Sequence, residues 1–379
     1  MSHAPTGILA SRHQQIRQAI VGRSLDALVV TSLPNITYLT NFSGSSAAVV
    51  MTEDRILFFT DSRYHTTVTE RQAGPCACPG FELVVVEGSY DATVTAHLAR
   101  LGARQIGFEA AHLTVSRHEW IASTLTAQSP GSKLVATEGV VEVGRVVKDA
   151  YEVGVLREAA QRLSDVATAA FADVRTGLTE REVAGSIDRR IREAGFERPA
   201  FETIVASGPN SALPHARPTE RKLTEGDLVV LDFGGVYDSY CVDLTRTVAV
   251  GRASARSREV HAAVLSAHDA AVAAVVPGQS RFAIDAAARA RLEAAGMADA
   301  FGHGTGHGLG IEIHEDPRIV KRRPDVDTRG EQVALGMVFT IEPGAYFPGW
   351  GGVRIEDDVL VTKGGVETLT RVTTELLEL

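Results

Sequence analysis

The chain has 379 residues, enough for two or three domains and a substantial buried core. Hydrophobic residues make up 44% of it and charged residues 22%, which is typical of globular proteins and excludes a disordered or fibrous class. The formal net charge of -9, from 38 basic and 47 acidic residues, argues against a nucleic-acid-binding surface.

The first part of the chain alternates between strand and helix signals. Helices are predicted over residues 91–101, where Gly102 ends the pattern, and over residues 114–127. Short apolar runs rich in β-branched residues predict strands at 26–31, 47–52, 55–60, 81–87 and 105–109. This alternation predicts an α/β domain with a mixed sheet over residues 1–147.

From Ala150 onward the pattern changes to long amphipathic helices separated by strand-like stretches. Thr179 and Glu182 form a capping box, in which each side chain bonds the backbone N–H of the other and so starts a helix. Two further helices are predicted over residues 254–276 and 280–296. The strand-like stretches are 227–234, 240–250, 337–342 and 352–361. We therefore expect a second domain over residues 148–379.

Asp232 and Asp243 lie in two consecutive strand-like runs, LVVLDFGGV and SYCVDLTRT. If the runs form a hairpin that turns at Tyr237-Asp238, the two carboxylates face each other directly, with Cβ atoms about 5 Å apart. Such a pair on a half-buried sheet needs a shared proton or a cation between its members. The alternative is that both are solvated strand residues.

Two glutamates lie in strand-like runs nearer the C-terminus. Alternation along residues 352–361 places Arg354 and Glu356 on the same face of one strand. Glu342 ends the β-branched run 337–342 and directly precedes Pro343. Taken singly, each glutamate fits an exposed strand end better than a functional site.

Glycine occupies every second position of the segment GHGTGHGLG, residues 302–310, which allows another part of the backbone to approach closely. His303 and His307 lie in this segment and His314 follows it, but neither a GxGxxG nor an HExxH motif is formed. A purely structural role for the three histidines is the alternative. His215, in the turn-rich SGPNSALPHARP, is by itself more typical of a surface histidine.

Taken together, two aspartates, two glutamates and one histidine form a set of mainly oxygen ligands: Asp232, Asp243, His307, Glu342 and Glu356. Such a set suits Mn²⁺, with Co²⁺ or Zn²⁺ as alternatives. Four carboxylates carry about the charge that two divalent ions neutralise. Paired-metal sites of this kind activate a bridging water near neutral pH.

The same residues carry a resemblance to a known family. The chain resembles the methionyl/prolyl metallopeptidases with the pita-bread fold, and within them the Xaa-Pro aminopeptidases and Xaa-Pro dipeptidases (prolidases). The segments that carry it stand in family order: SGPNSALPH, LDFGGVYDSYCVDLTRT, GHGTGHGLGIEIHE, TIEPGAY and GVRIEDD. More weakly, YLTNFSGSSAAVVM and FFTDSRY resemble the creatinase-type N-terminal domain.

The resemblance implies a fold of class α/β (α+β). It comprises a creatinase-like α/β domain with a mixed sheet, followed by a pita-bread domain whose curved antiparallel sheet is covered by helices. Asp232 and Asp243 would hold one metal ion and His307 the other, whose ligands Asp243 also joins. Glu342 and Glu356 would complete the cluster, with Glu356 and Asp243 bridging.

The resemblance also implies roles around the metals. The outer histidines, His215, His303 and His314, would bind the substrate carbonyl or stabilise the tetrahedral intermediate. Arg354 and Tyr346 match positions that orient metal ligands.

The implied reaction is metal-dependent cleavage in front of proline. A hydroxide bridging the two metals would attack the scissile carbonyl, and Glu342 would protonate the leaving proline nitrogen. Dipeptidases of the family tend to carry an arginine about fourteen residues before the glutamate of EPG, where this chain has Thr328 followed by Arg329. The stretch between Glu342 and Glu356 is short, as in compact bacterial aminopeptidases. Both features favour an Xaa-Pro aminopeptidase, with an Xaa-Pro dipeptidase as the alternative.

A catalytically silent pita-bread binding module is the alternative from another class. Family members that became binding scaffolds have lost metal ligands, whereas all five are present here. Proline-containing peptides are the expected partners, and the resemblance suggests a homodimer. A membrane partner is not expected, because no window approaches about 20 apolar residues. Residues 1–15 show no secretory signal, and Cys76, Cys78 and Cys241 form no disulfide framework, which together predict a cytoplasmic location.

Overall fold

The computed structural model describes residues 3–379, which divide into two compact units. The first unit ends at Arg145 and the second spans Val146–Leu379. Each has its own sheets and its own hydrophobic core. Between residues 3 and 379, no helix has both the length and the apolar character that crossing a membrane would require.

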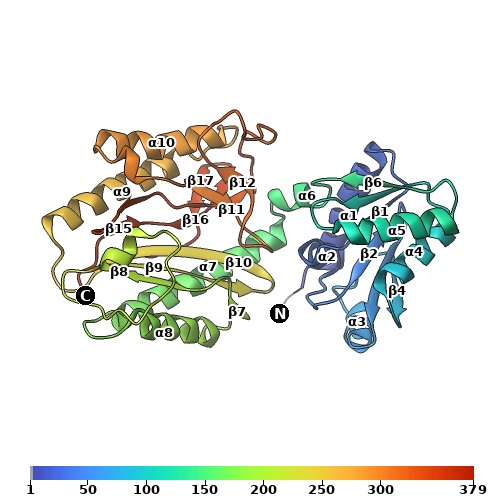
Figure 1. Cartoon of the computed structure of the whole chain (residues 1–379), viewed down its shortest axis with the longest axis horizontal. Coiled ribbons are helices and arrows are strands. Elements are labelled where there is room, and N and C mark those ends of the chain that lie inside the picture. Colours follow the sequence, from blue (N-terminus) through green and yellow to red (C-terminus); the bar gives the residue numbers. More distant parts are fainter. Residues whose placement is uncertain (1–2) are drawn as a thin grey trace. The chain divides into compact units, whose positions relative to one another are not determined.

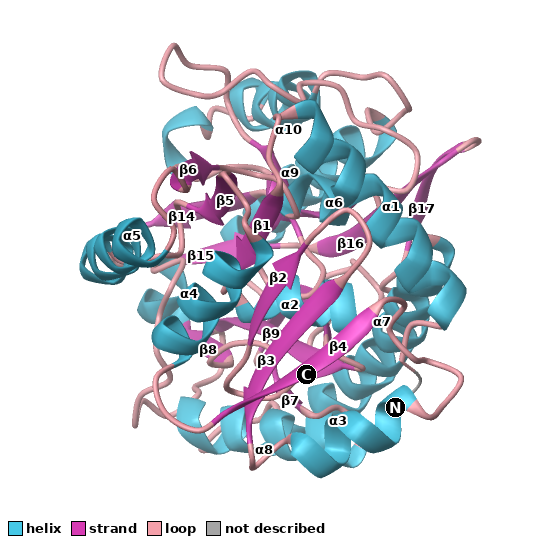
Figure 2. Ribbon diagram, turned by 90° about the vertical axis from the view of Figure 1, so that its right-hand side faces the viewer, coloured by secondary structure: helices cyan, strands magenta, loops and turns pink. Residues whose placement is uncertain are grey.

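The first unit is built on a six-stranded mixed sheet in the order β4-β3-β2-β1-β5-β6, drawn as neighbouring arrows in Figure 2. Within it β2 runs antiparallel to β1 and β3, and the other neighbours pair in parallel. The strands are β1 (Ala27–Val30), β2 (Ala48–Met51), β3 (Ile56–Asp61), β4 (Phe81–Val86), β5 (Gln105–Glu109) and β6 (Lys133–Thr137). The mixed sheet confirms the predicted class of this unit.

Helices connect or flank the strands of the first unit: α1 (Thr6–Gly22), α2 (Leu33–Thr40), α3 (His65–Gln72), α4 (Tyr90–Leu101), α5 (Val115–Gln128) and α6 (Glu142–Val146). The sequence predicts α4 and α5 but not α1. Although the buried face of α1 has helical spacing, it includes Arg12 and His13 between Leu9 and Ile16, which breaks the apolar pattern.

The second unit repeats a helix pair followed by antiparallel strands (Figure 1). Its helices are α7 (Ala150–Ala170), α8 (Glu180–Glu193), α9 (Ala255–Ala273) and α10 (Arg281–Ala294), with short 3₁₀ turns η1 (Phe171–Asp173), η2 (Gly208–Ala212) and η3 (Ala298–Ala300). Its first strands are β7 (Arg198–Pro199), β8 (Ile204–Ser207), β9 (Leu228–Tyr237) and β10 (Tyr240–Ala249). The later ones are β11 (Gly306–Gly308), β12 (Glu315–Ile319), β13 (Val338–Ile341), β14 (Gly344–Phe347), β15 (Gly351–Arg354), β16 (Asp357–Thr362) and β17 (Gly365–Thr368).

The strands of the second unit lie between the two helix pairs. Figure 1 shows α9 and α10 on one side of them and α7 and α8 on the other. One apolar cluster joins α7 and α8 to β9 and β10, and a second joins α9 and α10 to β13, β15 and β16. A bridge between Thr245 of β10 and Glu356 connects the two halves of the unit, of which the first runs from α7 to β10 and the second from α9 to β17. The predicted antiparallel sheets covered by helices are thereby confirmed.

The β9–β10 hairpin turns at Asp238-Ser239, one residue later than predicted. Both residues have positive φ, 49° and 71°, as the two central residues of a type I′ turn require. Asp232 therefore pairs with Thr245, and Asp243 pairs with Gly234. The prediction that the two aspartates face each other directly is wrong: they lie two residues apart along the same face of the hairpin.

The predicted strand over residues 352–361 is split. β15 ends at Arg354, β16 begins at Asp357, and Glu356 lies in the break between them. The backbone N–H of Glu356 donates to the Thr245 carbonyl at 3.1 Å, while Arg354 still pairs with Gly344 of β14. Arg354 and Glu356 are therefore not neighbours on one continuous strand, because the chain leaves one sheet and enters another between them.

Candidate metal centre

One cavity of the second unit, of about 580 Å³, brings the predicted site residues together. It is lined by all of them except Tyr346: Asp232, Asp243, His215, His303, His307, His314, Glu342, Arg354 and Glu356. Tyr346 on β14 contacts these lining residues through hydrogen bonds with His303 and Arg354. Both halves of the unit contribute, so the site exists only when they are folded together.

Three of the predicted ligands form a compact buried cluster. Asp243 on β10, His307 on β11 and Glu356 between β15 and β16 each offer one atom, and these atoms lie within 4.8 Å of one another. Glu342 follows β13, and its Oε1 lies 3.6 Å from His307 Nε2. This spacing is compatible with metal ligands that share neighbouring ions.

Asp232 on β9 completes the set of carboxylates. Its Oδ2 accepts a hydrogen bond from the Arg354 guanidinium. Its Oδ1 is buried and has no hydrogen-bond partner within residues 3–379. A buried carboxylate oxygen without a partner is costly, and a cation in the cavity would remove that cost.

The orientation of His307 leaves one ring nitrogen available as a ligand. Nδ1 lies 3.0 Å from the Gly308 carbonyl oxygen and donates to it, so Nε2 carries the lone pair on the side of Glu342. Burial lowers the pKa of His307 to about 3, which keeps the imidazole neutral at pH 7. A neutral imidazole with a fixed tautomer is the form that binds metal ions.

The buried acids repel one another when no cation is present. Burial, followed by the charge of Asp232, raises the pKa of Asp243 well above its ordinary value. Burial and the charge of Asp243 do the same to Glu356, and burial raises the pKa of Glu342 to about 7. Divalent cations reverse this effect, because they favour the ionised carboxylates. The residues present therefore fit divalent metal ions.

Arg354 connects several of these groups. It is 3% exposed and donates from Nε to Thr245 Oγ1 at 3.1 Å and from Nη1 to the Tyr346 hydroxyl at 2.9 Å, besides its bond to Asp232. Thr245 Oγ1 in turn donates to Glu356 Oε2 at 2.5 Å. One guanidinium thus orients carboxylates from both halves of the unit.

The remaining histidines lie around the acids. His303 Nε2 is 2.9 Å from the Tyr346 hydroxyl, and the rings of His307 and His314 meet edge to face with centroids 4.4 Å apart. Burial lowers the pKa of His303 to about 4 and also lowers the pKa of His314. Both are therefore neutral near pH 7. His215 is exposed to the cavity on the segment after η2.

Sequence reasoning does not identify two further residues of the site. Thr245 lies two residues after Asp243 on the same strand face, and this alternation is a signal that could have found it. Arg318 on β12 lines the cavity opposite His307 in the strand register, and its charge lowers the pKa of His307, His314 and Glu342. Its position on the exposed face of the strand EDPRI is only a weak signal.

Thr328 and Arg329, by contrast, do not line the cavity. The side chain of Arg329 donates to Asp327 Oδ2 at 2.7 Å and is 85% exposed. The cationic side chains that line the cavity are therefore Arg217, Arg318 and Arg354, and the segment around residue 328 supplies none of them.

Comparisons with known proteins agree with this geometry. Residues 154–363 match metallopeptidase family M24, and residues 12–147 match the creatinase/prolidase N-terminal domain. The chain is 36% identical to the uncharacterized peptidase YqhT of Bacillus subtilis over 96% of this chain and 99% of that protein.

Two solved structures have the same fold over nearly the whole chain. The Xaa-Pro dipeptidase from Bacillus anthracis is 34% identical, with a TM-score of 0.89 over 98% of this chain and 100% of that one. The X-Pro aminopeptidase from Thermotoga maritima MSB8 is 31% identical, with a TM-score of 0.84 over 94% of this chain and 98% of that one. The creatinase-like first unit and the pita-bread second unit expected from the sequence are thereby confirmed.

Proposed function

Because the chain belongs to metallopeptidase family M24, we propose that it hydrolyses the peptide bond in front of proline with two divalent metal ions. The ions, for which Mn²⁺ is the best match to the oxygen-rich ligands, would be held by Asp232, Asp243, His307, Glu342 and Glu356. The observation that carries the proposal is the buried group of four carboxylates and one neutral imidazole lining a single cavity.

Divalent ions bound there would lower the pKa of a water molecule toward neutrality and polarise the scissile carbonyl. The proton transfers would be carried out by side chains of the protein. Glu342 Oε1 lies at the cavity wall near His307 Nε2, and is placed to take a proton from water and to pass it to the proline nitrogen. The hydrogen bond from the Arg354 guanidinium keeps Asp232 oriented during these transfers.

The histidines bind the reacting carbonyl. His314 is neutral near pH 7, so it can donate one N–H to the carbonyl oxygen as negative charge develops on it. His303 is also neutral, but its Nδ1–H donates to the Gly304 carbonyl at 2.8 Å and its Nε2 faces the Tyr346 hydroxyl at 2.9 Å, so it acts through Tyr346. His215 supplies a second donor from its exposed position. Donors held in place before the reaction cost little reorganisation when the charge forms.

The position of Arg318 at the cavity wall favours dipeptides as substrates. A dipeptide carries its carboxylate directly on the proline, and Arg318 offers a guanidinium at the cavity wall, on the strand beside His307. We therefore propose Xaa-Pro dipeptidase activity. The second candidate is the Xaa-Pro aminopeptidase favoured by the sequence, which is supported by the position of Thr328 and Arg329 outside the cavity.

The test is hydrolysis of Ala-Pro and Ala-Pro-Ala side by side, with Mn²⁺ added and after chelation. Metal-dependent cleavage of Ala-Pro with little cleavage of Ala-Pro-Ala supports the dipeptidase. The reverse preference supports the aminopeptidase. If a preparation with two bound metal ions per chain cleaves neither peptide, the proposed substrate class is wrong.

A further inference from the structure

Both ends of the segment that carries His215 donate hydrogen bonds to one buried carboxylate, that of Glu180. Glu180 is the first residue of α8, is 0% exposed and does not line the cavity. The segment begins at Ser207, the last residue of β8, passes through η2 and His215, and reaches Thr219. Glu180 contacts residues on both sides of His215.

The contacts of Glu180 use both of its carboxylate oxygens. Oε1 accepts from the N–H of Ser207 at 2.7 Å, from its Oγ at 2.7 Å and from Asn210 Nδ2 at 3.0 Å. Oε2 accepts from the N–H of Thr219 at 2.9 Å and from its Oγ1 at 2.6 Å. One side chain thereby closes the loop between Asn210 and Thr219.

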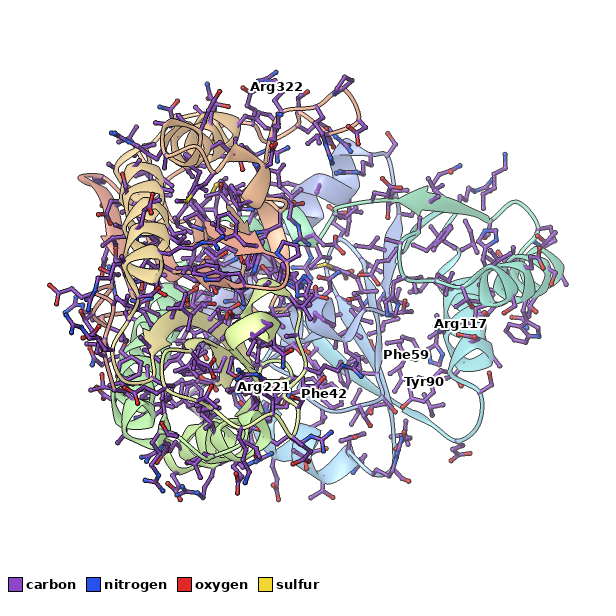
Figure 3. All side chains as sticks on the ribbon, turned by 60° about the vertical axis from the view of Figure 1, so that its left-hand side comes forward. Phe42, Phe59, Tyr90, Arg117, Arg221 and Arg322 are labelled. Carbon is purple, nitrogen blue, oxygen red and sulfur yellow. The ribbon has the colours of Figure 1, made fainter. Side chains whose placement is uncertain are left out.

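Two arginines make further hydrogen bonds to the same segment. Arg221, labelled in Figure 3, donates from Nη1 to Ser207 Oγ at 2.6 Å and to Asp227 Oδ2 at 2.6 Å. On the cavity side, Arg354 Nη1 lies 3.3 Å from the Pro214 carbonyl and donates to it. The residue directly before His215 is therefore connected to the group that also holds Asp232.

Glu180 remains ionised in this environment. Burial alone would raise the pKa of Glu180, but the hydrogen bonds from Thr219, Ser207 and Asn210 hold it below its ordinary value. Glutamine at this position would turn an N–H₂ group toward donors that need an acceptor, so the backbone N–H of either Ser207 or Thr219 would lose its partner.

We propose that Glu180 is a positioning residue that holds His215 at the substrate side of the cavity. The inference rests on the proposed function in one respect, since His215 must contact the substrate for its position to affect turnover. Glu182 provides a matched control. It lies on the same helix and accepts from the N–H of Thr179 at 2.7 Å, but contacts no part of the segment from residue 208 to 218 among the described hydrogen bonds.

The catalytic test is a double-mutant cycle. Glu180→Gln should lower kcat by about 10- to 100-fold, the loss expected when a reacting group is misplaced by up to about 1 Å. Metal content should stay unchanged, and Glu182→Gln should keep kcat near that of the wild type. In the His215→Ala background, Glu180→Gln should cause no further loss. An equal loss in both backgrounds would show that Glu180 does not act through His215.

Hydrogen exchange tests the positioning without any substrate. Glu180→Gln should accelerate exchange in residues 208–219, whereas Glu182→Gln should not. Unchanged exchange would overturn the inference even if the wild type is an active peptidase. If the wild type cleaves no proline peptide but the exchange still responds, the proposed function fails and the positioning stands. Thr219→Val, which removes one donor from the network, replaces Glu180→Gln if that variant does not fold.

Discussion

The carboxylate of Asp358 accepts a hydrogen bond from the backbone N–H of Asp243 at 3.0 Å. Asp358 is 0% exposed and does not line the cavity, so one buried acid fixes the backbone of another that does. The bond joins β16 to β10 across the two halves of the second unit. The position of the Asp243 backbone is therefore set in part by a contact between strands far apart in the chain.

Asp243→Ala should remove both metal binding and activity, because Asp243 forms the buried ligand cluster together with His307 and Glu356. Loss of a residue that only orients a ligand costs about 10- to 100-fold, and loss of the ligand itself should cost more. Metal per chain and turnover of Ala-Pro are the measurements, with the exposed Asp269→Ala as control. Near-normal turnover of Asp243→Ala would contradict the assignment.

His314→Ala should lower kcat while leaving metal content near normal. The ring of His314 packs edge to face on His307 but is not within the compact ligand cluster, and loss of one donor to a developing oxyanion costs about 100- to 1000-fold. Elemental analysis and steady-state kinetics on the same preparation separate the two effects. If the variant loses its metal ions, His314 is a ligand and the interpretation is wrong.

Arg318→Met should raise KM for Ala-Pro much more than KM for Ala-Pro-Ala. A hydrogen bond between charged groups contributes about 1.5–3 kcal/mol, so the expected loss for the dipeptide is about 10- to 100-fold. The matched control is Arg329→Met, since Arg329 lies outside the cavity and bonds to Asp327. If Arg318→Met raises KM equally for both peptides, Arg318 does not bind the carboxylate of the dipeptide.

The stability of the first unit should depend on pH through His13. Burial lowers the pKa of this histidine from 6.5 to about 4, and its Nε2 lies 2.7 Å from the Leu39 carbonyl oxygen. Between pH 6.5 and 4 the unfolded chain binds the proton and the folded one does not. The free energy of unfolding therefore falls as the pH falls through this window, by about 3 kcal/mol in total, and levels off below it.

Urea unfolding between pH 4 and 7.5 measures this dependence. His13→Leu should remove about 3 kcal/mol of it, whereas the exposed His65→Leu should leave it unchanged. If the free energy of unfolding of His13→Leu depends on pH as strongly as that of the wild type, groups other than His13 cause the effect.

Much of the site could be predicted from the sequence because its residues lie in strongly marked local contexts. Asp232 and Asp243 lie in strand-like runs. His303 and His307 alternate with glycines, and a Cβ added at Gly306 would collide with the Thr340 carbonyl. The capping box of α8 is also local, and it is present in the structure.

Features that depend on distant residues were accessible only in the folded chain. The register of β9 and β10 follows from two positive φ angles at Asp238 and Ser239, neither of which is glycine, so the composition of the turn does not reveal it. The break between Arg354 and Glu356 arises because Glu356 bonds to Thr245, more than a hundred positions earlier in the chain.

The sequence by itself determined the ligand types, their order and the class of both units, since these depend on residue identity and local periodicity. The tertiary structure alone decided which arginines line the cavity and which contacts hold the loop that carries His215. Arg318 and Glu180 both lie in segments with ordinary local patterns. They acquire their positions only when strands and helices from separate parts of the chain pack together and bury the groups between them.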